Sequence, residues 1–425
     1  MAGSERLSLD FWKFWVGQTI SNLGSSFTQW AVPLLVFRLT HSAVNLGIAT
    51  AATFLPYLLF GLLLGAWMDR VDRKRAMIAL DSLNAIVILS IPLVATFWHL
   101  SVWWIYGVTF IQSSVFIAFS AGEFAAIPSL VSTDDLVTAN GRIQATYSAA
   151  QVAGPLLAGA LVSLIPLQWV MAFDAASFAV SAVSLATIRK SFNAAAEGEA
   201  KDPTTILHDV VEGLRYVLGH PVLRNISLMM ALINFVSSTA WAQLVLFASD
   251  RLHASVREIG VLFAAGSAGV VVTGLLAGRL RKVFSFTALA MTSLMLMGGL
   301  TIVFATMRWF WIALPIWAAQ SGLGILFNIN TGSLRQAIVP NHMLSRILSI
   351  AGVLAWSAIP AGALVGGWVI KTTGNVQAVY AGIGSLVIAI AVFFRFFTAL
   401  GDAQRYVDER LAEEASLTAE AAPTF

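Results

Sequence analysis

The sequence predicts an all-α membrane protein in which twelve transmembrane helices form two six-helix bundles. Hydrophobic residues make up 58% of the 425 residues and charged residues only 11%, whereas a soluble domain usually carries about 25% charged residues. Apolar runs of the roughly 20 residues that cross a bilayer recur along the chain, and its two halves repeat one another. Lipid must therefore solvate much of this chain.

Twelve apolar runs, separated by short polar or basic segments, are the expected spans. The first six are 12–38, 43–68, 76–98, 102–128, 140–165 and 169–188. The second six are 222–247, 256–279, 284–306, 309–334, 344–370 and 375–398.

A polar segment between the two sets is too hydrophilic to span. Within it, Asp202 and Pro203 favour a helix start, with an acid as the cap and proline at the first helical position. One apolar stripe follows, made of Ile206, Leu207, Val210, Val211, Leu214, Val217 and Leu218. We expect an amphipathic helix on the inner membrane face. The expected parts are an N-terminal bundle (1–188), a cytoplasmic linker (189–221), a C-terminal bundle (222–400) and a cytoplasmic tail (401–425).

Basic residues predict the orientation of the spans. If the N-terminus is cytoplasmic, only five of the 25 Lys and Arg residues fall on the other side, which are Arg38, Arg251, Arg257, Arg308 and Lys371. Basic residues concentrate on the cytoplasmic side of membrane proteins. We therefore expect a multi-pass protein of the cell (inner) membrane with both termini in the cytoplasm.

A repeat of small residues relates the two halves. The positions Ser42, Gly47, Gly61 and Gly65 recur 213 residues later as Ser255, Gly260, Gly274 and Gly278. Six spans repeated as six favour a transporter, because two matched bundles can rock around a site near the membrane midplane. Glycines four apart, as at 61 and 65, also predict close helix packing.

The loop after the second expected span carries a glycine, an acid and a basic cluster. It contains Gly65, Asp69, Arg70, Arg73 and Lys74. This loop resembles the signature loop of the major facilitator superfamily, whose fold has two six-helix bundles. The resemblance implies a gate at the cytoplasmic mouth, where charged hydrogen bonds hold one conformation. A simpler interpretation is that the basic residues only set topology.

Three more segments, 15–24, 39–43 and 212–223, are similar to the branch that contains enterobactin exporters and macrolide efflux proteins. Gly154, Pro155 and Gly159 resemble the end of the antiporter motif of exporters in this superfamily. The proline removes a backbone hydrogen bond and bends the helix. Upstream, three expected glycines of the motif are replaced by Gln144, Tyr147 and Gln151.

The superfamily resemblance implies a substrate path between spans 1, 4, 7 and 10. Polar residues follow one face of span 1, and polar groups inside a bilayer face the protein interior or a watery cavity. Polar bonding between helices is the alternative for any single residue. The candidate cavity residues are Gln18, Asn22, Ser25, Gln29, Gln112, Phe116, Phe119, Asn234, Trp241, Gln320 and Asn328.

Three acids lie within expected spans and are candidates for proton coupling, namely Asp81, Glu123 and Asp174. An acid inside a membrane is costly and is a functional candidate by default. Glu123 is favoured because it shares a helical face with three of the cavity candidates, although a structural pairing with Arg73 is the competing interpretation. Spans 3 and 6 are peripheral in the superfamily, which favours a packing role for the other two acids.

The sequence therefore favours a secondary exporter of a small amphiphilic molecule, such as a drug, a macrolide-like compound or a siderophore, working by proton antiport. A lipid or lysolipid flippase and an uptake symporter are the alternatives within transport. A membrane enzyme or sensor is the alternative of another class, but the chain shows no paired catalytic acids and no nucleophile with a base. We expect no cofactor, no metal, no nucleic-acid partner and a monomer. The partners would be the substrate, protons and the lipid bilayer.

Overall fold

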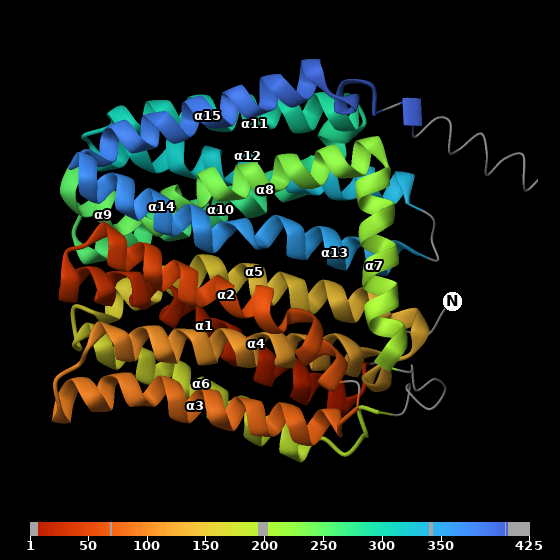
Figure 1. Ribbon diagram of the computed structural model, residues 1–425. Coiled ribbons are helices and arrows are strands. Elements are labelled where there is room, and N and C mark those ends of the chain that lie inside the picture. Colours follow the sequence, from red (N-terminus) through yellow and green to blue (C-terminus); the bar gives the residue numbers. More distant parts are fainter. Residues whose placement is uncertain (1–6, 69, 194–202, 340–342, 404, 407–425) are drawn as a thin grey trace, which may run out of the picture. The chain divides into compact units, whose positions relative to one another are not determined.

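The computed structural model describes residues 7–68, 70–193, 203–339, 343–403 and 405–406. Every regular element in these ranges is a helix (Figure 1). Asp69 of the expected gate lies outside the described residues, as do Asp202 and most of the expected tail.

The first half contains one helix for each expected span. The helices are α1 (Leu9–Thr40), α2 (Ala43–Met68), α3 (Arg73–Phe97), α4 (Val102–Leu130), α5 (Leu136–Leu161) and α6 (Leu167–Thr187). Polar caps define several of their starts. The side chains of Ser8 and Asp72 accept hydrogen bonds from the backbone amides of Phe11 and Arg75, at 3.2 and 3.0 Å, as N-cap residues commonly do.

The second half has more helices than expected spans. It contains α8 (Pro221–Ala242), α9 (Leu244–Arg251), α10 (Val256–Arg281), α11 (Phe286–Thr306), α12 (Phe310–Ile338), α13 (Leu344–Trp356), α14 (Ala358–Thr373) and α15 (Val376–Phe397). The seventh expected span breaks at Gln243 and the eleventh at Ser357. Pro360 explains the second break, because it has no amide hydrogen to donate to the carbonyl of Trp356. Helix α7 (Pro203–Gly219) begins at the proline where the sequence predicts a start.

Ten helical segments are both long enough and apolar enough to cross a membrane, in the part of the chain that is described. Helices α1 and α5 have 32 and 26 residues, which is enough length, but they are less apolar than the other ten. Counting them by length gives the expected twelve. The predicted all-α, multi-pass architecture is confirmed.

The chain divides into two compact units. Unit 1 contains Met1–Ala200, Trp241–Ser267 and Ala363–Gly374, and unit 2 contains Lys201–Ala240, Ala268–Gly362 and Asn375–Phe425. Within unit 1, α1 packs against α6 and α5, α3 packs against α6 and α4, and α2 packs against α4. Within unit 2, α11 packs against α12 and α15, and α7 packs against α13.

Helices α1 and α6 approach especially closely. A Cβ atom added at Gly24 would lie 2.1 Å from the Ser177 hydroxyl and 2.9 Å from the Asp174 Cα atom. A Cβ at Gly17 would lie 2.9 Å from that of Ser184. Only glycine permits this approach, which brings polar groups of the two helices within bonding distance of one another.

Candidate functional site

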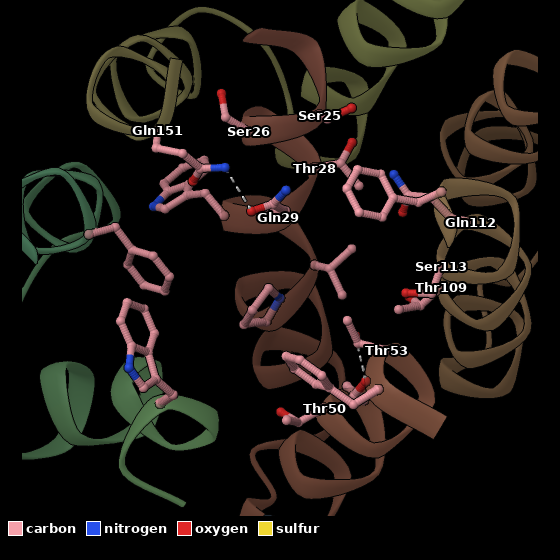
Figure 2. Close-up of a pocket in the computed structure, with 18 of the residues that line it drawn as sticks. Ser25, Ser26, Thr28, Gln29, Thr50, Thr53, Thr109, Gln112, Ser113 and Gln151 are labelled. Carbon is pink, nitrogen blue, oxygen red and sulfur yellow. Dashed lines mark hydrogen bonds between the residues drawn. The ribbon is translucent and has the colours of Figure 1, made fainter. Parts of the chain in front are cut away.

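A cavity of about 480 Å³ lies within unit 1, in the size range of ligand pockets. Helices α1, α2, α4 and α5 form most of its wall (Figure 2). No Asp, Glu, Lys, Arg or His is among the described residues that line it. They are Ser25, Ser26, Thr28, Gln29, Trp30, Val32, Pro33, Leu46, Ala49, Thr50, Thr53, Phe54, Tyr57, Asn84, Thr109, Gln112, Ser113, Phe116, Tyr147, Gln151, Pro155, Phe178, Trp241, Ala242, Phe263 and Ser267.

The polar groups of the cavity are hydroxyls and amides. In Figure 2 the Gln151 side chain reaches from α5 to Gln29 on α1, and its Nε2 donates a 3.3 Å hydrogen bond to Oε1 of Gln29. Tyr147 lies one helical turn before Gln151 and also lines the cavity. Two of the three positions that depart from the antiporter motif therefore supply cavity side chains.

Aromatic rings supply much of the remaining wall. Trp241 and Phe263 pack edge to face with their centroids 6.2 Å apart, and Phe116 is 46% exposed. Such rings bind apolar surface and attract cations through their faces. The cavity can therefore hold a molecule with apolar bulk, a few hydrogen-bonding groups and either no charge or one positive charge.

Five of the predicted cavity residues line this cavity, namely Ser25, Gln29, Gln112, Phe116 and Trp241. The other six are not in its wall: Gln18, Asn22, Phe119, Asn234, Gln320 and Asn328. The side chain of Gln18 donates a 3.0 Å hydrogen bond to the Ser181 hydroxyl on α6, and Phe119 belongs to a buried apolar cluster. Asn234, in unit 2, donates to the carbonyl of Ala355 at 2.9 Å.

Helix α2 supplies a face of the cavity that the sequence reasoning missed. Thr50, Thr53, Phe54 and Tyr57 all line it, and Figure 2 places the two threonines on the α2 side. Positions 50, 53 and 57 share one helical face. That spacing of polar groups in an apolar span could have identified them.

The three membrane acids lie on three helices of unit 1. Asp81 on α3 and Asp174 on α6 are 1% and 0% exposed. Glu123 on α4 has a buried Oε1 atom with no hydrogen-bond partner in the described part of the chain. Asp81 lies within electrostatic range of both other acids. None of the three is in the wall of the cavity.

The loop between α2 and α3 contacts the segment that follows α6. Arg73 is buried, and its backbone amide donates a 3.1 Å hydrogen bond to Oδ1 of Asn193. Nδ2 of Asn193 donates in turn to the carbonyl of Val71 at 3.0 Å, and the Lys74 ammonium donates to the carbonyl of Ile188. The basic residues of the loop thus hold the start of the linker.

The antiporter-like residues of α5 face two different helices. A Cβ atom at Gly154 would lie 1.7 Å from the Ser26 hydroxyl on α1. A Cβ atom at Gly260 of α10 would lie 2.5 Å from the carbonyl oxygen of Pro155 and 3.5 Å from the Cα of Gly159. All of these residues belong to unit 1, so α5 is in close contact on both sides.

The repeated glycines differ in their packing. A Cβ atom at Gly47, the counterpart of Gly260, would lie 2.5 Å from the carbonyl oxygen of Ala363. At the other four, Gly61, Gly65, Gly274 and Gly278, an added Cβ meets nothing within 4 Å among the described residues. The close approach occurs at the earlier glycine of each repeat, and close packing at the glycine pairs stays a prediction.

The all-helical, multi-pass fold and its uncharged cavity define a membrane transporter of small molecules. Residues 8–422 match the model of the transmembrane secretion effector family, and the chain belongs to this family of the major facilitator superfamily. The predicted resemblance is confirmed.

Relatives agree with this assignment, and solved structures share the fold. The chain is 27% identical to macrolide efflux protein A of Streptococcus pyogenes, over 90% of this chain and 95% of that protein. It is 24% identical to the multidrug efflux pump Tap of Mycolicibacterium fortuitum, over 81% and 85%. The fold is similar to the nucleoside transporter NupG (TM-score 0.76, 13% identity, 91% and 98% covered). It is also similar to a bacterial homologue of the lysosomal transporter Spinster (TM-score 0.70, 17% identity, 96% and 99% covered).

Proposed function

We propose that this protein exports a small amphiphilic molecule, of the macrolide or multidrug type, from the cytoplasm by proton antiport. The observation that carries the proposal is the uncharged cavity lined by aromatic rings, hydroxyls and amides. Such a wall suits a bulky, mostly apolar solute, and its described residues include none of the fixed cations that phosphates or sugar phosphates require. The two relatives above, named for macrolide and multidrug efflux, support the same substrate class.

In alternating access, rocking of the two bundles would open the cavity first to one side of the membrane and then to the other. The close approaches at Gly154 and Gly260 would belong to one state of that cycle. The loop residues Gly65, Asp69, Arg70, Arg73 and Lys74 would gate the cytoplasmic side. A lipid flippase is the second candidate, because aromatic rings and hydroxyls would also accept a single-chain lipid. We further propose that the protein lies in the inner membrane as a monomer, with both termini in the cytoplasm.

The test is a susceptibility and accumulation screen in a bacterial host that lacks its own efflux pumps. Cells that express the protein should accumulate less radiolabelled erythromycin than cells that carry the empty vector, and a protonophore should abolish the difference. Equal accumulation of erythromycin and of a panel of cationic dyes would refute drug export. Faster outward movement of a fluorescent lysolipid would then favour the flippase.

A further inference from the structure

A hydroxyl group connects the cavity to one of the buried acids. Oγ of Ser25 donates a 3.3 Å hydrogen bond to Oδ1 of Asp174, and Ser25 also lines the cavity. Phe178, one helical turn after the acid on α6, is part of the same wall. In Figure 2, Ser25 and Ser26 lie on opposite sides of α1. Asp174 thus lies one side chain behind the cavity surface.

The environment of Asp174 disfavours its ionised form. The residue is 0% exposed, and its Oδ2 atom has no hydrogen-bond partner in the described part of the chain. The Ser177 hydroxyl can donate to the Asp174 backbone carbonyl at 2.7 Å or to Oδ1 at 3.4 Å. The hydroxyls of Thr28 and Ser25, both in the cavity wall, are the other donors within reach of this carboxyl group, and the 3.3 Å hydrogen bond is the one from Ser25. A buried charge without a partner costs several kcal/mol.

Charged groups on the neighbouring helices do not compensate that cost. Between Phe14 and Phe37, α1 contains no charged residue and no histidine, and on α6 Asp174 is the single charged residue. Helix α3 contributes Asp81, a second acid, which bonds to Ser181 two turns further along α6. Glu123 on α4 is within electrostatic range of Asp81. None of these groups is basic, so no cation among them pairs with an ionised Asp174.

We propose that Asp174 is the proton-binding site of the transporter and that Ser25 relays the proton between it and the cavity. In loading, the Ser25 oxygen accepts a proton from a hydronium ion in the cavity, which becomes neutral water, while the serine's own hydrogen moves to Oδ1. The serine then remains neutral and the carboxylate becomes a carboxylic acid. Substrate that occupies the cavity displaces this water and so prevents proton transfer through Ser25. Substrate and proton therefore bind in alternation. This assignment rests on the proposed proton antiport, and it selects Asp174 over Glu123 because a hydrogen bond joins Asp174 to the cavity residue Ser25.

Two serine variants separate a relay from a packing role. Both Ser25 and Ser177 contact Oδ1 of Asp174, but only Ser25 lines the cavity. In proteoliposomes with an imposed pH gradient, Ser25→Ala should lower erythromycin transport about tenfold, whereas Ser177→Ala should transport normally and Ser25→Thr should restore the rate. A gradient of Na⁺ should not drive the wild type. Equal effects of the two alanine variants, or transport driven by Na⁺, would overturn the proposal.

The acid can be tested without any substrate. Infrared difference spectra of the reconstituted full chain, recorded between acidic and alkaline buffer, should show a carboxylic acid band that disappears in Asp174→Asn and remains in Glu123→Gln. If the wild type fails to transport erythromycin but the band behaves in this way, the proposed substrate class is wrong and the proton site stands. If the band remains in Asp174→Asn, the assignment of Asp174 is wrong whatever the substrate.

Discussion

Nη1 of Arg73 donates a 3.2 Å hydrogen bond to the backbone carbonyl of Phe192, and the Ser129 hydroxyl donates to the same carbonyl at 3.3 Å. The Phe192 ring is buried against Phe14, with their centroids 6.1 Å apart. Phe192, a single residue in the segment that follows α6, therefore contacts the start of α3, the end of α4 and the start of α1. The signature loop is part of the bundle's internal structure as well as a source of positive charge.

The first prediction compares two arginines of that loop. Arg73→Ala should reduce export about tenfold, because loss of a hydrogen bond to a charged group costs about 1.5–3 kcal/mol in the state that contains it. Arg75→Ala should leave export nearly unchanged, since the Arg75 side chain is 88% exposed. Both variants remove one basic residue from the same loop. Equal transport by the two variants at equal expression would mean that the basic residues of this loop only set the orientation of the spans.

The second prediction concerns the approach of α10 to α5. Gly260→Ala should impair export, because the new Cβ atom would lie 2.5 Å from the carbonyl oxygen of Pro155. Gly61→Ala is the matched control, since an added Cβ there meets nothing within 4 Å in the described structure. Drug accumulation in cells that express equal amounts of each variant is the measurement. Unimpaired export by Gly260→Ala would mean that this approach is not needed for the cycle.

The third prediction tests the aromatic wall of the cavity. Phe116→Ala should weaken substrate binding about tenfold, because a phenylalanine ring that the substrate covers contributes up to about 1.5–3 kcal/mol. Phe124, two turns further along α4, is 79% exposed and does not line the cavity, so Phe124→Ala should bind normally. Tryptophan fluorescence titration with erythromycin measures both affinities. A similar loss in both variants would argue that the effect arises from the stability of α4.

The fourth prediction concerns pH and the contact between α1 and the linker. Burial raises the pKa of Asp10, but hydrogen bonds from the amides of Lys190 and Arg189 and the nearby Lys13 outweigh it, and the net pKa lies below 3.8. A carboxyl group with a lowered pKa stabilises the fold at neutral pH, and this contribution is lost as pH falls through that pKa. Asp10→Asn should therefore melt earlier than wild type at pH 7, with the difference shrinking towards pH 3. Thermal unfolding in detergent measures this, and a difference that does not vary with pH would contradict it.

The fifth prediction concerns orientation. Reporter domains fused after Lys74 and after Lys282 should read as cytoplasmic, and one fused near His99 should read as external, because of the unequal distribution of basic residues. Alkaline phosphatase and green fluorescent protein fusions distinguish the two sides. An external reading after Lys74 together with a cytoplasmic reading near His99 would invert the expected orientation.

Hydropathy predicts the helices well because membrane crossing requires length and apolarity, and both are local properties of a sequence. The breaks at Gln243 and Ser357 were missed for different reasons. Pro360 could have indicated the second. Gln243 is fully buried and donates a 2.8 Å hydrogen bond to the carbonyl of Ala43, a contact between residues 200 positions apart that no local pattern reveals.

Periodicity predicts the cavity only in part. It relates residues of one helix to each other, but it does not say which neighbour a face meets. Gln18 and Ser25 lie on the same stripe of α1, yet the first bonds to α6 and the second also reaches the cavity. For the same reason, periodicity favours Glu123, which shares a helical face with cavity candidates on its own helix. It cannot reveal that Asp174 on α6 is connected to the cavity through Ser25, a residue of α1.

The modest apolarity of α1 and α5 has a consequence for biogenesis. A segment partitions from the translocon into lipid according to its own transfer free energy, and polar residues near its centre oppose this step. Helix α1 carries Gln18, Asn22 and Gln29, so its stable residence in the bilayer depends on a later segment that covers these groups. Gln18 bonds to α6 and Gln29 bonds to α5, and α6, the later of these two helices, is synthesised more than a hundred residues after α1. Nascent chains released before α6 should therefore be substrates for membrane quality-control proteases, and the first bundle should become protease-resistant only when α6 has emerged.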